Sequence, residues 1–75
     1  MRRPVPHLVK KSLLLSGHAT SVALEPLFWE TLSRAARRDG ETLHSLINRV
    51  DALEPEVPLT RKLRLAALNA ALKGL

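Results

Sequence analysis

The hydrophobic pattern of the chain changes its period at Glu25 and Pro26, and this change constrains the fold most. Before it, residues 20–24 (TSVAL) alternate in polarity, as in a strand with one buried face. After it, apolar side chains recur at helical spacing, at Phe28, Leu32, Ala35 and Ala36, with Trp29 beside them. Proline suits the first position of a helix. A short strand followed directly by an amphipathic helix is therefore predicted.

A second β-compatible run, residues 10–15, precedes the strand and is separated from it by Ser16-Gly17-His18-Ala19. Glycine at the first central position of a two-residue loop predicts a type II′ hairpin turn, which pairs Leu15 with Thr20. One face would then carry Leu13, Leu15, Thr20, Val22 and Leu24. The opposite face would carry Lys10, Ser12, Leu14, Ala19, Ser21 and Ala23. The alternative is a single strand over 20–24 without a hairpin.

Two further helices follow. Gly40 is expected to stop the first helix, and Thr42 to cap a second. The inward side chains of this second helix would be Leu43, Leu46, Ile47, Val50 and Leu53, and Pro55 and Pro58 would end it. A third helix is expected over about 60–73, with an apolar stripe of Leu65, Leu68 and Leu72. The predicted class is α+β and mostly helical.

The chain has 75 residues and no cysteine. A domain of this size buries only about 60% of its unfolded surface, so association of two copies is the expected way to complete a core. Thiolate metal sites are excluded, and the histidines at 7, 18 and 44 lack metal-ligand spacing. No nucleophile–base spacing is found, and a short chain offers little room for a pocket. No enzyme, metal or cofactor is predicted.

Twelve Lys and Arg against seven Asp and Glu give a formal charge of +5. This balance favours nucleic acid, an anionic membrane surface or an acidic protein as partner. The apolar run Leu13–Leu15 is too short for a secretory signal or a membrane span. A cytoplasmic protein with no membrane partner is expected.

The order of elements resembles the ribbon-helix-helix DNA-binding family. More narrowly, the chain resembles a bacterial subgroup with a G-H-x-T-S-hydrophobic-x-L-E-x-x-F-W pattern. Here that pattern falls on Gly17, His18, Thr20, Ser21, Val22, Leu24, Glu25, Phe28 and Trp29. The tail resembles the subgroup's Leu-Arg-hydrophobic element at Leu63, Arg64 and Leu65. The expected organisation is a flexible basic arm at 1–9, a ribbon-helix-helix domain at 10–54, and a linker with a C-terminal helix packed on the dimer at 55–75.

The resemblance implies an intertwined homodimer in which each chain supplies one strand of an antiparallel ribbon. Its shared core would contain Val22, Leu24, Phe28, Trp29, Leu32 and Ile47. The outward face of the ribbon would enter the DNA major groove, as in a bacterial transcriptional regulator. The DNA-binding residues implied are Lys10, Lys11, Ser12, Ala19, Ser21, Thr42 and His44, the last two at a helix N-terminus that grips the DNA backbone.

The chain departs from the subgroup where it would meet DNA. Ala19 follows His18, where the subgroup often has a basic residue, and Arg61 replaces a small hydroxyl residue in the tail. Short outward side chains make no bidentate contact to a base, so phosphate contacts would dominate. The alternative function is a dimeric, antitoxin-like interaction module whose 56–75 segment binds a protein partner through its leucine stripe.

Overall fold

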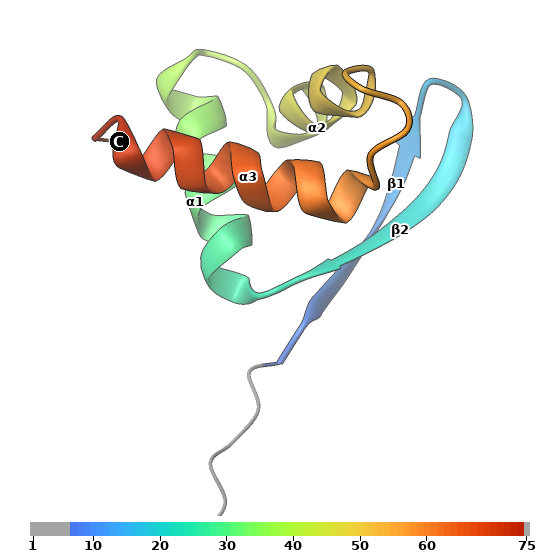
Figure 1. The fold of residues 1–75 in the computed structure, drawn as a ribbon, viewed down its shortest axis with the longest axis horizontal. Coiled ribbons are helices and arrows are strands. Elements are labelled where there is room, and N and C mark those ends of the chain that lie inside the picture. The colour runs from blue at the N-terminus through green and yellow to red at the C-terminus, as the bar shows by residue number, and fades with distance from the viewer. Residues whose placement is uncertain (1–6, 75) are drawn as a thin grey trace, which may run out of the picture.

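The computed structural model describes residues 7–74, which form a β-hairpin followed by three helices (Figure 1). The elements are β1 (Val9–Leu15), β2 (His18–Leu24), α1 (Pro26–Arg38), α2 (Leu43–Asp51) and α3 (Leu59–Leu72). The hairpin is a long twisted arm along one side of the helices, and α3 crosses α1 (Figure 1). The predicted α+β, mostly helical class with an N-terminal hairpin and an appended C-terminal helix is confirmed.

The hairpin turn differs from the predicted one. Ser16 and Gly17 are its central residues, and both have positive φ, 49° and 84°. This is the type I′ arrangement rather than type II′. Leu15 consequently pairs with His18 and not with Thr20. Because the register differs from the predicted one by two residues, each side chain keeps its predicted face.

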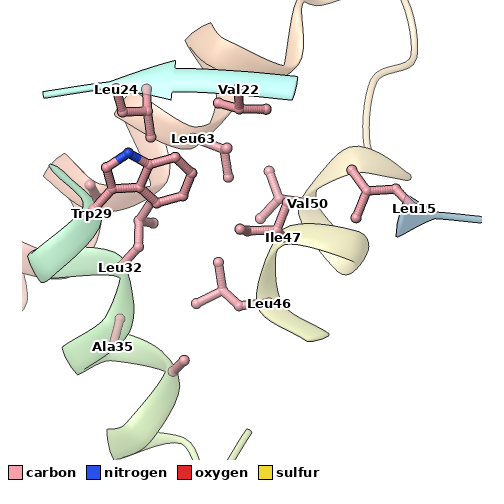
Figure 2. Packing of buried hydrophobic residues seen from close by; sticks show 12 residues of the cluster. Leu15, Val22, Leu24, Trp29, Leu32, Ala35, Leu46, Ile47, Val50 and Leu63 are labelled. Carbon is pink, nitrogen blue, oxygen red and sulfur yellow. The ribbon is translucent and has the colours of Figure 1, made fainter. Parts of the chain in front are cut away.

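The core lies between the inward face of the hairpin and the three helices (Figure 2). Its buried members are Leu15, Val22, Leu24, Trp29, Leu32, Ala35, Ala36, Leu46, Ile47, Val50, Leu63 and Ala67. Five of the six residues expected in a shared dimer core are in this set, and Phe28 is partly buried against it. A single chain is therefore enough to enclose them.

The ends of α1 and α2 follow the sequence signals. Gly40, at φ 72°, lets the chain turn after α1, and the N–H of Glu41 donates to the carbonyl of Ala36 at 2.9 Å. Thr42 accepts from the N–H of Ser45 at 3.0 Å, which confirms the predicted cap.

The inward position predicted for Leu53 is wrong, because α2 ends at Asp51 and Leu53 is 55% exposed. The helix stops a full turn before the first of the two prolines that were expected to end it.

The apolar stripe predicted for the third helix does not pack on its own chain. Leu65, Leu68 and Leu72 are 57%, 52% and 78% exposed. The helix instead packs through its opposite face, with Leu59, Leu63, Ala66, Ala67 and Ala70. The alanines lie toward α1, which itself presents Ala35 and Ala36, so the two helices approach through small side chains. Close packing of the two helices through alanines is thus favoured over burial of the larger leucine side chains.

The predicted domain boundaries lie at 9/10 and 54/55. Val9 is already the first residue of β1, and residues 1–6 of the predicted arm fall outside the described residues. Helix α3 packs on α1 and β2 of its own chain. The division into a 10–54 domain and a 55–75 segment remains a prediction.

Candidate nucleic-acid interface

The outward face of the hairpin brings together four of the predicted site residues. Lys10 lies opposite Ala23, Ser12 opposite Ser21, and Leu14 opposite Ala19. Alternation along each strand turns these side chains away from the helices. All are exposed except Ala23, which is half-buried. The surface is a narrow ribbon with one cation and two hydroxyl groups.

Lys11 does not belong to this surface. It pairs with Val22, whose side chain is in the core, and its Nζ lies over the Trp29 ring at 5.4 Å from the centroid. The position gives a cation–π contact. The two adjacent lysines, predicted as a phosphate-binding pair, therefore point to opposite faces of the hairpin, and only Lys10 lies on the outward face.

Trp29 fixes the hairpin to the helices. Its indole Nε1–H donates to the carbonyl of Val9 at 2.7 Å, while the ring is buried in the core. A buried tryptophan needs a partner for this donor. The first residue of β1 is thereby held against the first turn of α1, which explains why the aromatic pair directly follows the strand.

The start of α2 is held against the other end of β1. The His44 ring donates from Nε2 to the carbonyl of Leu14 at 2.6 Å, which requires the tautomer with the proton on Nε2. Nearby, the Ser16 hydroxyl donates to Oδ1 of Asn48 at 3.4 Å. The predicted DNA contact His44 thus has a structural role, and it places the α2 N-terminus beside the ribbon.

The first turn of α2 offers backbone donors to an anion. Ser45 and Leu46 use their N–H groups on Thr42, which leaves those of Leu43 and His44 for an external acceptor. The neighbouring carboxylate of Glu41 is bound by Arg49 at 3.0 and 3.2 Å, and this bond raises the pKa of Arg49. The ion pair offsets the negative charge that Glu41 places beside the predicted phosphate-binding position.

The Leu-Arg-hydrophobic element of the tail supports the junction between β2 and α1. Leu63 is fully buried, and the Arg64 guanidinium donates to both carboxylate oxygens of Glu25 at 3.0–3.2 Å. The same group lies 5.8 Å from the centroid of the Phe28 ring. The third member of the element, Leu65, is exposed.

The carboxyl group of Glu25 has a lowered pKa. A backbone hydrogen bond at Glu25 is the largest cause, desolvation opposes it, and the bond and charge of Arg64 add to the lowering. A lowered pKa in the folded chain means that the pair stabilises the fold above the ordinary carboxyl pKa. This contribution is lost as the pH falls through the lowered value.

Lys62 is a structural residue that sequence reasoning missed. It is only 7% exposed, and its Nζ donates to the carbonyls of Asp51 at 2.9 Å, Leu53 at 2.5 Å and Glu54 at 3.3 Å. A cation here also meets the negative end of the α2 dipole. In the sequence, the only sign of this role is that Lys62 directly precedes Leu63, which is buried on the same helix. The apolar stripe expected from the sequence lies on the other face of the helix, so it does not point to Lys62.

The described residues were also searched for a metal-ion site and for a membrane-spanning helix. Among residues 7–74, no three side chains of the metal-ligating types come close enough to hold an ion. In the same range, no helix is both long enough and apolar enough to cross a membrane.

Comparisons with known proteins agree with this geometry. A family model described as a ribbon-helix-helix domain matches residues 8–71. A solved structure of an uncharacterized protein from Bordetella pertussis Tohama I is 38% identical, with a TM-score of 0.76 over 87% of this chain and 56% of that chain. The present chain thus spans just over half the length of that protein. No curated protein matches the sequence.

Proposed function

The chain belongs to the ribbon-helix-helix domain family, and from that premise we propose that it is a homodimeric DNA-binding regulator of bacterial transcription. The outward face of its hairpin enters the major groove, and the N-terminus of α2 binds the DNA backbone. The protein acts in the cytoplasm, where bacterial DNA lies. The observation that carries the proposal is the ribbon of exposed side chains, Lys10, Ser12, Leu14, Ala19 and Ser21, with a helix N-terminus fixed beside it.

Electrostatics supports this proposal. Each chain has a formal charge of +5, so two copies carry 2 × 5 = +10. Such a charge speeds association with a polyanion and makes binding fall steeply with salt. Lys10 lies opposite Ala23 near the open end of the hairpin, and in the proposed complex it contacts a phosphate of the groove wall.

Base recognition by this face is weak. Ser12 and Ser21 each offer one hydroxyl group, and Ala19 has only a methyl group, which suits the methyl of thymine. A bidentate contact to guanine or adenine requires a longer side chain such as Arg, Asn or Gln. The proposal therefore predicts substantial affinity for any duplex and modest discrimination between sequences.

The test of the groove-side assignment is Lys10→Ala. The substitution removes one phosphate contact per chain, so the plot of log affinity against log salt should become shallower by about 1 per chain. The loss should be similar on every duplex sequence, measured by fluorescence anisotropy. Lys73→Ala is the matched control, because Lys73 is exposed directly after α3, and the C-terminal end of α3 lies away from the hairpin (Figure 1). A loss confined to one duplex, with the slope unchanged, would refute a phosphate contact.

A second candidate function is favoured by the exposed leucines of α3, the stripe Leu65, Leu68 and Leu72. They lie on the face opposite the one that packs on α1, and Leu65 lines a hollow between α2 and α3 together with the exposed Leu53. A helix with apolar side chains on both faces suits an interaction module. In this function the 56–75 segment docks a protein partner.

The stripe is tested by changing all three leucines to serine. The fold should persist, because these side chains take no part in the core. Sedimentation velocity then compares the self-association of the variant with that of the wild type. A monomeric variant assigns the stripe to the second copy of this chain. An unchanged dimer leaves it for a different protein, as the second function requires.

A further inference from the structure

The hairpin is a complete two-stranded ribbon within one chain. Its strands are paired without a break from Val9 opposite Leu24 to Leu15 opposite His18. The strand that matches the family pattern is β2, and the structure gives it β1 as its antiparallel neighbour. In the arrangement implied by the resemblance, that neighbour is β2 of a second chain.

The helices of the same chain bury the second half of β2 on its inward face. Val22 and Leu24, the inward side chains of β2, are 3% and 0% exposed. Leu63 of α3 lies among them and among the side chains of α1 and α2 (Figure 2). Residues on β1 and α3 thus fill the positions that a second chain would have to fill in an intertwined core.

Contacts at both ends hold β1 in place. Its first residue, Val9, accepts a hydrogen bond from the buried indole of Trp29, and Leu14 accepts one from His44. Each contact joins β1 to a helix that follows β2 in the same chain. The pairing of β1 with β2 is therefore part of the packed structure and not a loose extension.

Strand widths limit what can enter the groove. If β2 also paired with β2 of a second copy, the sheet would have four strands, and its outer strands would lie about 14 Å apart. The major groove is about 12 Å wide, which admits a two-stranded ribbon but not such a sheet. Groove entry and a ribbon shared between chains are thus compatible only if β1 leaves β2.

We propose that each chain forms its own ribbon, with β1 in the position that the partner strand takes in an intertwined dimer. What this inference implies for DNA recognition rests on the proposed function. The two strands of the ribbon present different residues, Lys10, Ser12 and Leu14 from β1 against Ala19, Ser21 and Ala23 from β2. A ribbon of two β2 strands would present the second set twice. The modest sequence preference of one ribbon is therefore for an asymmetric DNA element, not a palindromic one.

Engineered disulfides distinguish the two arrangements, because the natural chain has no cysteine. Leu15 and His18 close a two-residue turn as a hydrogen-bonded pair, so alternation makes Ser12 and Ser21 a non-hydrogen-bonded pair. The Cα atoms of such a pair lie about 4.5 Å apart, a separation that suits a disulfide. The test compares the double variant Ser12→Cys/Ser21→Cys with Ser21→Cys alone, both oxidised as full-length protein without DNA.

The double variant should form an intramolecular disulfide and migrate as a monomer under denaturing, non-reducing conditions. At about 10 micromolar protein, the intramolecular product should exceed random cross-linking by about 100-fold, since the effective concentration within one chain is millimolar. The single variant should remain unlinked. A covalent dimer of the single variant in high yield would overturn the proposal, because Ser21 is the middle residue of β2 and a shared antiparallel ribbon centred on it brings two copies of residue 21 together.

A measurement on the wild-type protein tests the same proposal if the cysteine variants do not fold. In a mixture of isotope-labelled and unlabelled chains, the contact between the Hα atoms of Ser12 and Ser21 should appear only as intramolecular. Its absence, with contacts instead between β2 residues of labelled and unlabelled chains, would overturn the proposal, because a shared ribbon pairs β2 with β2 of the second chain. Neither experiment contains DNA, so a failure of the proposed function leaves this result intact and can be recognised separately.

Discussion

Trp29→Ala is expected to lower the free energy of unfolding by about 3–5 kcal/mol, as deletion of a large buried aromatic does. Trp29 is 5% exposed, and its loss also removes the hydrogen bond that holds Val9 of β1. A domain of 75 residues has roughly 4–11 kcal/mol in total. The variant should therefore lose a large share of its stability, and urea unfolding followed by circular dichroism measures the loss.

Leu27→Ala is the matched control for this substitution. It lies two positions earlier on the same helix and is 71% exposed, so its replacement should change the stability by about 0.5 kcal/mol or less. If both variants unfolded at the wild-type urea concentration, the role of Trp29 in joining hairpin and helices would be wrong.

Lys62→Met is expected to cost about 2–3 kcal/mol. Methionine fills a similar volume but donates no hydrogen bond, so the carbonyls of Asp51, Leu53 and Glu54 lose a shared donor. Replacement of a buried ion by an apolar group is often neutral when its partners are replaced too, but here the carbonyls remain. Glu54 has a φ of 41°, a left-handed conformation that is uncommon for a side-chain-bearing residue. The loss should appear as a lower urea midpoint.

Arg61→Met removes the same charge one position earlier, at an exposed residue, and serves as the control. A large loss in Lys62→Met with little change in Arg61→Met would assign the effect to the buried hydrogen bonds. Equal losses in the two variants would instead assign it to net charge and would contradict the structural role of Lys62.

The hairpin shows how far local sequence determines structure here. The alternation around Gly17 predicts both strands and the face of every side chain. It does not predict the turn type, because a type I′ turn also needs a positive φ at Ser16, a conformation rarely taken by residues other than glycine, asparagine and aspartate. The alternative of a single strand without a hairpin is excluded by the observed pairing.

Helix α3 shows where periodicity fails. Both of its faces carry apolar side chains, and the larger ones, Leu65, Leu68 and Leu72, indicated the wrong face. The choice depends on the neighbour: the small side chains of Ala35 and Ala36 on α1 favour the alanine-bearing face of α3. Nothing local to 59–72 contains this information, which also explains why Lys62 was missed.

Of the predicted DNA-binding residues, the outward set follows directly from strand alternation. Strand alternation does not support Lys11 as a DNA contact. The resemblance implied this role for Lys10 and Lys11 together, although the two side chains lie on opposite faces of the hairpin. The bond from His44 to Leu14 joins residues that lie 30 apart in sequence, and no local pattern indicates it. Long-range contacts of this kind position the proposed interface.

DNA binding itself is tested most directly by fluorescence anisotropy of a labelled duplex of random sequence, titrated with the purified protein at low and at physiological salt. The proposed function predicts binding at low salt that weakens steeply as salt rises, with a slope set by the number of phosphates contacted. Absence of binding even at low salt would contradict it, and would favour the interaction module carried by the leucines of α3.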